Sequence, residues 1–219
     1  RNKKLIKMKY LSILFITLFT FSGYGQTSKE ARALLEEVKT KTLSYENQKI
    51  TFSNVLEVPN SDPDKASTKR SMEGTIFLKG ESYRLEMNDV IYLYDTKKLH
   101  IIDIDSEEID ITSVDEETPL SPTSILNEFD KGYSLKLENK KTIEGKSIQF
   151  VRLKPTGASD VLDVLLGIDT KTKTIYSYQM LGMNKVVTVL TITDYQTNLS
   201  LPANTFVYNE SDWEGFYIN

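Results

Sequence analysis

Short segments in which apolar and polar residues alternate fill the chain after Met72, and they constrain its fold more than any other feature. In one of them, Tyr83, Leu85 and Met87 share one face while charged residues occupy the other. Brief polar connections such as 95–98 suit antiparallel hairpins. About ten strands are expected in all, which favours one strongly curved antiparallel sheet or an open, incomplete barrel. A two-sheet sandwich would give nearly the same pattern.

The pattern also predicts the limits of the longest loop and of the last strand. A polar loop containing proline and aspartate is expected from Pro59 to Ser71, as the longest loop of the chain. The last strand is expected at Phe206–Tyr208.

One helix is predicted before the strands. Thr27, followed three residues later by Glu30, forms a capping box at its start. The apolar stripe of this helix recurs at helical spacing and consists of Ala31, Leu34, Leu35 and Val38.

A second, short helix is predicted to interrupt the strands. Ser121 can cap it and Pro122 suits its first turn, and it is expected to end near Gly132. Its apolar face would be formed by Ile125, Leu126 and Phe129.

The first 25 residues have the three-part pattern of a secretory signal peptide. A basic stretch comes first, the apolar run Leu11–Phe21 follows, and small residues lie between Ser22 and Gly25. The rival interpretation is a membrane anchor, but a spanning helix needs roughly 20 apolar residues, about twice this run. We therefore expect cleavage after Gly25, a single domain over residues 26–219, and a location in the periplasm of a Gram-negative envelope.

Charge limits the partners of the expected mature domain. The chain has 27 basic and 31 acidic residues, and five of the basic ones lie in the first 25 residues. The remainder therefore has 22 basic residues against 31 acidic ones, a net charge of −9. Such a surface repels the phosphates of nucleic acids and of anionic lipids.

Residues that support catalysis or metal binding are scarce. The chain has no cysteine, and its one histidine, His100, lies in an alternating segment typical of a half-buried strand. Neither a G-x-S-x-G elbow nor a phosphate-binding glycine loop is present. The acidic runs 103–110 and 115–117 lack the spacing of a helix-loop-helix calcium site and are interpreted as a solvated surface. Glycosidase-type carboxylate pairs depend on separation in space, and no pair stands out. We expect no enzyme, no cofactor and no metal.

The order of these elements, together with three stretches of sequence, resembles the periplasmic outer-membrane lipoprotein carrier family, the LolA-like proteins. The stretches are Glu73–Lys79 with its leading Gly74, then 83–85, then the hairpin Tyr94–His100. In the second half, 165–169, Ile175 and 204–208 also match, so that the resemblance covers roughly residues 28 to 217. It consists of many weak positions and includes no catalytic signature.

The resemblance implies a mainly β fold, an open antiparallel barrel with a helical lid over an apolar cavity. It implies a carrier that shelters the acyl chains of lipoproteins and passes them toward the outer membrane. The alternative is a lipid-binding or envelope-sensing module of the same fold that does not shuttle. The expected cavity residues are Ile76, Leu78, Tyr83, Leu85 and Met87. The expected first-helix and lid residues are Leu34, Leu35, Val38, Ile125, Leu126 and Phe129. Each of these residues could equally be ordinary core, because alternation marks an inward face without showing whether it is filled.

The resemblance also implies the partners. They are acylated lipoproteins, an inner-membrane lipoprotein-release transporter and an outer-membrane acceptor, with the carrier acting as a monomer and binding no nucleic acid.

The sequence departs from the family at four positions, one of which is Glu214, where proline is usual in the tail, and the other three concern the hairpin and the lid. The hairpin glycine is Thr96 here, the tryptophan is His100, and the basic residue that latches the lid in some members aligns with Gly80. Arg84 is the nearest substitute for that latch, but alternation directs it away from Leu85 and hence from the cavity.

Overall fold

One twelve-stranded sheet forms the body of the protein. The structure, a computed structural model, describes residues 23–62, 64–113, 126, 129 and 132–219. The strands of the first half are β1 (Gln48–Val58), β2 (Thr68–Lys79), β3 (Ser82–Met87), β4 (Val90–Tyr94), β5 (Lys98–Asp103) and β6 (Glu108–Ser113). Those of the second half are β7 (Tyr133–Ile143), β8 (Lys146–Pro155), β9 (Val161–Asp169), β10 (Thr174–Gly182), β11 (Val187–Thr197) and β12 (Tyr217–Ile218).

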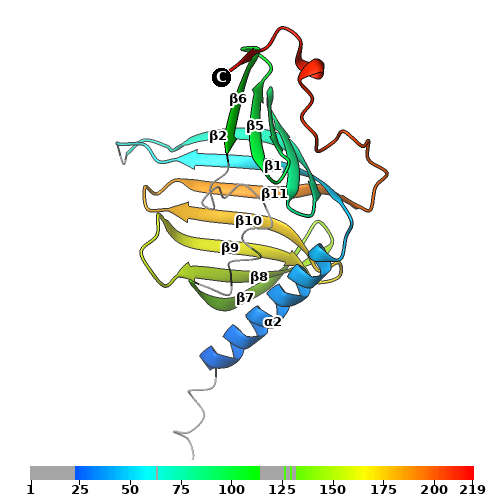
Figure 1. Cartoon of the computed structure of the whole chain (residues 1–219). Helices are drawn as coiled ribbons and strands as arrows, with labels where there is room; N and C mark the ends of the chain where they lie inside the picture. Colours follow the sequence, from blue (N-terminus) through cyan, green and yellow to red (C-terminus); the bar gives the residue numbers. More distant parts are fainter. Residues whose placement is uncertain (1–22, 63, 114–125, 127–128, 130–131) are drawn as a thin grey trace, which may run out of the picture.

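The sheet consists of two meanders that are joined in its middle. Its order is β12-β6-β5-β4-β3-β2-β1-β11-β10-β9-β8-β7, and all pairs are antiparallel except β12 with β6. The joint is the long pairing of β1 with β11, from Gln48 opposite Thr197 to Glu57 opposite Val187. Figure 1 shows the strong curvature, with β5 and β6 turned steeply against β7–β10. Within the described residues the edges β7 and β12 do not pair, so the barrel is open.

Helix α2 (Gly23–Leu43) covers the β7–β10 end of the inner face, as Figure 1 shows. It begins four residues before Thr27, so the predicted capping box does not mark its start. The buried stripe of α2 packs against apolar strand residues, and together they form a core whose side chains are nearly or fully inaccessible to water. The buried members of this core are Ala31, Leu35, Val38, Leu126, Phe129, Leu135, Val151, Leu153, Val164, Leu166 and Ile168.

The C-terminal segment crosses the outer face of the opposite half. Tyr208, Trp213 and Phe216 pack against an apolar cluster built on Ile91, Ile102 and Ile109. The segment includes a short 3₁₀ helix (Glu210–Trp213) and then β12, which pairs with the edge strand β6. The prediction of a strand at Phe206–Tyr208 is therefore wrong. The tail packs by its aromatic side chains there, and its only ladder hydrogen bonds come later.

Other sequence predictions about the fold hold, with shifted boundaries. The curved single sheet with a helix over its inner face is confirmed, and the sandwich alternative is excluded by the continuous strand order. Strand β2 begins at Thr68, so the predicted loop Pro59–Ser71 is shorter than expected because its last residues pair with β1. The first 22 residues, the acidic run 115–117 and most of the predicted second helix lie outside the described residues. No helix within the described residues has the length and apolar character needed to span a bilayer.

Candidate functional site

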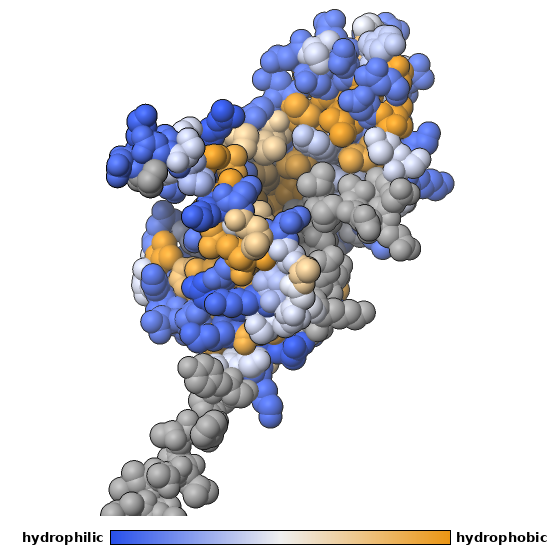
Figure 2. All heavy atoms as spheres, turned by 90° about the vertical axis from the view of Figure 1, so that its left-hand side faces the viewer, coloured by the Kyte–Doolittle hydropathy of each residue, from blue (hydrophilic) through white to orange (hydrophobic). Residues whose placement is uncertain are grey.

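The inner face of the other half, β1–β5 with β11, has an apolar surface that α2 does not cover. Six side chains form its buried floor, namely Ile50, Phe52, Ile76, Leu78, Tyr83 and Leu99. Eight more pack against them but remain partly open to solvent, namely Leu85, Met87, Tyr92, Tyr94, Ile101, Leu190, Ile192 and Tyr195. Figure 2 shows apolar side chains gathered in a hollow between two lobes of the molecule. We call the surface formed by these fourteen residues the inner hollow.

Cross-strand register arranges the inner hollow in rows of increasing exposure. In the innermost row Leu78, Tyr83 and Leu99 are buried, whereas Tyr94, which lies opposite Tyr83 and Leu99, is half-buried. In the next row Ile76 is buried, but Leu85, Tyr92 and Ile101 are half-buried. Exposure therefore rises along β3 and β5 toward the end where the β1–β2 hairpin lies.

Close backbone approach shapes the floor at Gly74. A Cβ atom at this position would lie 2.6 Å from Cζ of the Phe52 ring, so the ring lies directly against the glycine. A larger residue here would push Phe52 out of the floor.

The five residues expected to line the cavity lie together in the inner hollow, at two depths. Ile76, Leu78 and Tyr83 are only 2–4 % exposed, and they belong to the filled floor. Leu85 and Met87 are half-buried on the surface of the hollow. Leu85 and Met87 are thus the two of the five that a ligand could touch without displacing other side chains.

The residues expected in the first helix and the lid lie in the other half. Leu35, Val38 and Phe129 are fully buried and Leu126 is nearly so, all within the core beneath α2. Leu34 packs at the edge of that core and is partly buried. Ile125 lies outside the described residues.

Sequence reasoning missed much of the inner hollow. Tyr92, Tyr94 and Ile101 showed the same alternation as Leu85, and their strands follow directly in the chain. They could have been included on that signal. Leu190 and Ile192 belong to the inner hollow only because β11 pairs with β1, and no local sequence pattern indicates that pairing.

The departures from the family pattern have local explanations. Gly80 occupies the β2–β3 turn with φ +58° and has no side chain that could act as the latch. Arg84 lies on the outer face, where its Nε donates to Glu86 Oε1 at 2.6 Å. Thr96 adopts φ +79° in the β4–β5 turn, a conformation that suits glycine and strains a β-branched residue.

Burial raises the pKa of two tyrosine hydroxyl groups in the inner hollow. Burial, reinforced by the neighbouring Tyr94 and Tyr92, raises the pKa of Tyr83 above its ordinary value. Burial likewise raises the pKa of Tyr195, whose hydroxyl donates to Gln48 Oε1 at 2.5 Å. These tyrosines stay neutral at physiological pH, so the surface that they form is apolar with a few polar atoms.

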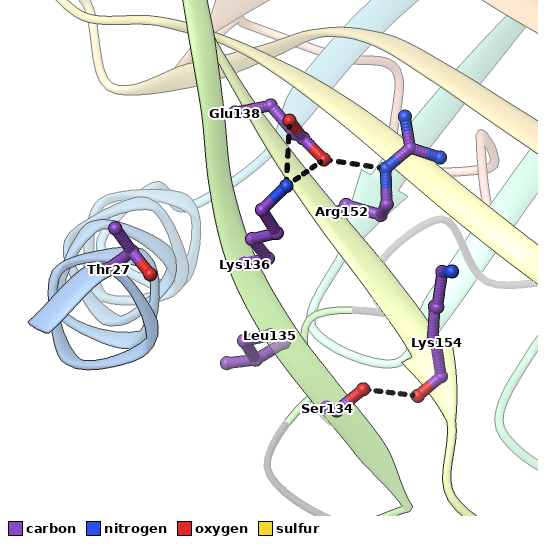
Figure 3. Close-up of a pocket in the computed structure, with 7 residues that line it drawn as sticks. All are labelled: Thr27, Ser134, Leu135, Lys136, Glu138, Arg152 and Lys154. Carbon is purple, nitrogen blue, oxygen red and sulfur yellow. Dashed lines mark hydrogen bonds and ion pairs between the residues drawn. The ribbon is translucent and has the colours of Figure 1, made fainter. Parts of the chain in front are cut away.

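A separate, polar pocket of about 430 Å³ lies at the edge strand β7. In Figure 3 the side chains of Lys136, Glu138 and Arg152 point toward one another. Lys136 Nζ lies 3.3 Å and Arg152 Nε 2.8 Å from the same Glu138 oxygen, and Arg152 also bonds to Asp163. Because these two cations are engaged with carboxylates, the pocket has the character of a surface ion network.

A second polar pocket, of about 400 Å³, lies between the ends of β10 and β11. Its walls include Tyr45, Tyr176, Asp169 and several threonines. Asp169 Oδ1 accepts the backbone N–H groups of Lys171 and Thr172, so this carboxylate serves the β9–β10 turn.

The one histidine and the described acidic run both have structural surroundings. His100 is buried on the outer face and stacks on Tyr208, with ring centroids 4.2 Å apart. No group of three or more potential metal ligands occurs among the described residues. Asp103 Oδ1, from the acidic run, accepts the backbone N–H groups of Asp105 and Ser106 in a turn.

Comparison with known proteins gives matches in structure only. No family model matches the sequence, and no curated protein matches it. An uncharacterized conserved protein from Thermus thermophilus is similar, with a TM-score of 0.58 at 10 % identity over 87 % of this chain and 98 % of that chain. At this identity the similarity shows the shared fold alone.

The structure has the fold that the sequence resemblance to LolA-like proteins implied. It has the open, strongly curved antiparallel sheet with a helix over its inner face that the sequence resemblance implied. Other similar structures include LprF from Mycobacterium bovis, with a TM-score of 0.49 at 12 % identity over 80 % of this chain and 97 % of that one. A putative outer membrane lipoprotein-sorting protein domain from Vibrio parahaemolyticus has a TM-score of 0.44 at 10 % identity, over 82 % and 97 % of the two chains.

Proposed function

We propose that the protein is a carrier that shelters the acyl chains of lipoproteins in the inner hollow and passes them toward the outer membrane. One observation carries the proposal, namely the row of half-buried apolar side chains Leu85, Tyr92 and Ile101 above a fully buried floor. Side chains of this kind normally complete their burial against another element of the fold. Here they remain accessible in a concave surface, which suits a removable apolar ligand.

The energetics favour a partly filled hollow over a deep empty one. Burial gains roughly 0.8 kcal/mol per CH₂, so a sixteen-carbon chain fully buried would gain on the order of 12 kcal/mol. A carrier that retained this full gain could not release its cargo. A shallow surface, to which the chain is only partly transferred from water, keeps the affinity low enough for delivery.

The N-terminal pattern supports the location of this activity. In the proposal, residues 1–25 direct export and are removed, and the remaining monomer acts in the periplasm. It would receive lipoproteins from an inner-membrane release transporter and deliver them to an outer-membrane acceptor.

The test is the chemical identity of the bound lipid. Protein purified from its native envelope is extracted with organic solvent, and the extract is analysed by mass spectrometry. A triacylated peptide is the expected result. Free phospholipid would favour the non-shuttling lipid-binding module, and an extract without lipid would contradict both functions.

A further inference from the structure

One half of β2 has a neighbouring strand on one side only. The strand pairs with β1 from Thr68 to Leu78, but its pairing with β3 covers only Gly74–Lys79, because β3 ends at Met87. Figure 1 shows the β1–β2 hairpin projecting beyond the strands next to it. Among the described strands, residues 68–73 therefore have no partner on the side away from β1. We call this segment the free edge.

A hydrogen bond at the start of β1 determines which backbone groups of β2 point away from β1. The N–H of Asn198 donates to the C=O of Asn47 at 2.9 Å, so odd-numbered residues of β1 direct their backbone groups toward β11. Even-numbered residues of β1 direct theirs toward β2, where Gln48 lies opposite Leu78 and the register does not shift. In β2, therefore, even-numbered residues face β1 and odd-numbered residues face the other side.

The free edge thus presents the backbone N–H and C=O groups of Lys69, Ser71 and Glu73, whose side chains are all exposed. An unpaired row of this kind is a template for an added strand. Residues 68–73 contain no proline and no bulge against β1, two devices that commonly block an edge. The Lys69 ammonium group lies 3.2 Å from Glu57 on β1, so it is directed toward the paired side of β2.

The free edge begins at the more exposed end of the inner hollow. Leu85 and Met87 lie along β3 in the hollow, and the free edge starts one residue beyond Gly74, which is opposite Met87. An acyl chain lying over these two side chains would keep its polar end at this exposed end, because a polar group loses free energy when it leaves water unpaired. A peptide attached to that end would enter the line that β3 leaves open.

We propose that the free edge binds, as an added antiparallel strand, the polypeptide segment that follows the acylated terminus of the cargo. This inference rests on the proposed function and adds a second binding site, on the edge of the sheet and not on its inner face. At about 3.4 Å per residue the edge accommodates roughly five residues of peptide. Main-chain hydrogen bonds supply the affinity in this mode, so the site would accept cargo proteins of unrelated sequence.

A matched pair of lipopeptides tests the added strand. The first probe is a hexadecanoylated pentapeptide of alternating threonine and serine, and the second is the same molecule with the nitrogens of its last four residues methylated. Both probes carry the same acyl chain and the same acyl amide, but the second cannot donate backbone hydrogen bonds and its methyl groups obstruct pairing. The wild-type protein is expected to bind the first about tenfold more tightly.

Two substitutions at one position locate the effect. Ser71→Pro removes an outward N–H and obstructs an added strand, and proline is tolerated at such an edge position. This variant is expected to bind the two probes equally. Ser71→Val changes the same side chain but retains the N–H, and it is expected to keep the preference. A preference that persisted in Ser71→Pro would overturn the assignment of the site to the free edge.

Amide hydrogen exchange supplies a readout that does not depend on a substitution. The N–H groups of residues 69, 71 and 73 are expected to exchange quickly in the free protein and to slow when the first probe binds, and not when the second does. Slow exchange at these three residues in the free protein would show that the edge is already paired, and would overturn the inference.

The binding results separate this inference from the proposed function. Equal and measurable binding of both probes by the wild type would overturn the added strand and leave acyl binding intact. Failure of the wild type to bind either probe would overturn both the added strand and the carrier function.

Discussion

The two halves of the inner face use similar residues in different ways. Under α2, inner-face side chains of β8 and β9 are completely covered, as the 0 % exposure of Val151, Leu153 and Leu166 shows. Over β3–β5, residues of the same type, such as Leu85 and Ile101, remain half-buried. The sheet is continuous across both halves, so the difference lies in what covers it. A covering helix converts an apolar sheet face into a core, and among the described residues no helix covers β3–β5 in this way.

Truncation in the covered half should have the largest effect on stability. Phe129 is fully buried beside α2, and Phe129→Ala is expected to cost ~3–5 kcal/mol because it leaves a cavity in a filled core. Urea unfolding followed by circular dichroism measures this. A cost below about 1 kcal/mol would mean that the two halves do not differ in packing.

The open half should tolerate the corresponding changes. Leu85→Ala is expected to cost less than ~2 kcal/mol, because the side chain is already partly in contact with solvent. Leu85→Trp should fold with near-normal stability, where a filled core would lose ~1–3 kcal/mol on overpacking. The added ring should occupy space in the hollow and weaken the binding of a fluorescent acyl probe. A destabilised Leu85→Trp with unchanged probe affinity would refute the assignment of the hollow.

Two turns of the open half allow a finer comparison. Gly80 and Thr96 both have positive φ, but only threonine is strained there. Thr96→Gly is therefore expected to raise stability by ~1 kcal/mol, measured as a shift of the urea midpoint. The turn should survive the change, because Asp95 Oδ1 still accepts the N–H groups of residues 97 and 98. The reverse change, Gly80→Thr, should lower stability and serves as the matched control.

The smallest expected effect concerns the outer face of the covered half. The hydrogen bond from Arg152, followed by that from Lys136, lowers the pKa of Glu138 below its ordinary value of 4.5. A depressed carboxyl pKa stabilises the fold above that ordinary value, and the contribution is lost as the pH falls through the lowered pKa. Glu138→Gln should remove this acid-range slope and cost under about 1 kcal/mol at neutral pH. Urea midpoints at a series of pH values between neutral and strongly acidic measure the slope. The same slope in Glu138→Gln as in the wild type would assign the acid loss to other carboxylates.

The sequence predicted which side chains share a strand face, and it missed the contacts between segments far apart in the chain. Alternation identified the strands and correctly placed Leu85 and Met87 on the same face as Tyr83. It also correctly directed Arg84 outward, where it meets Glu86. These results depend on the two-residue period of a strand, which is a local property.

What the sequence did not predict depends on contacts between distant segments. Ile76, Leu78 and Tyr83 were grouped with Leu85, but depth in the hollow depends on Ile50 and Phe52 from β1, which pack beside them. The contribution of Leu190 depends on a pairing between residues far apart in the chain. The prediction of a strand at Phe206–Tyr208 was wrong. In the structure Tyr208 stacks on His100, and residues next to Tyr208 in the sequence do not indicate that contact. Alternation indicates a face, and tertiary contacts decide whether that face is filled.

The central pairing of β1 with β11 has a consequence for how the chain folds. The hydrogen bond from Thr193 to Thr51 joins residues 142 positions apart, and the two meanders form one sheet through that joint. Closing so large a loop is slow, because its entropy is lost before the contacts that reward it can form. The joint of the two meanders cannot be completed until residue 197 has been synthesised, and β12 joins the sheet later still, so the sheet stays incomplete until late in synthesis. A polypeptide that is threaded through a membrane before it folds benefits from such a delay.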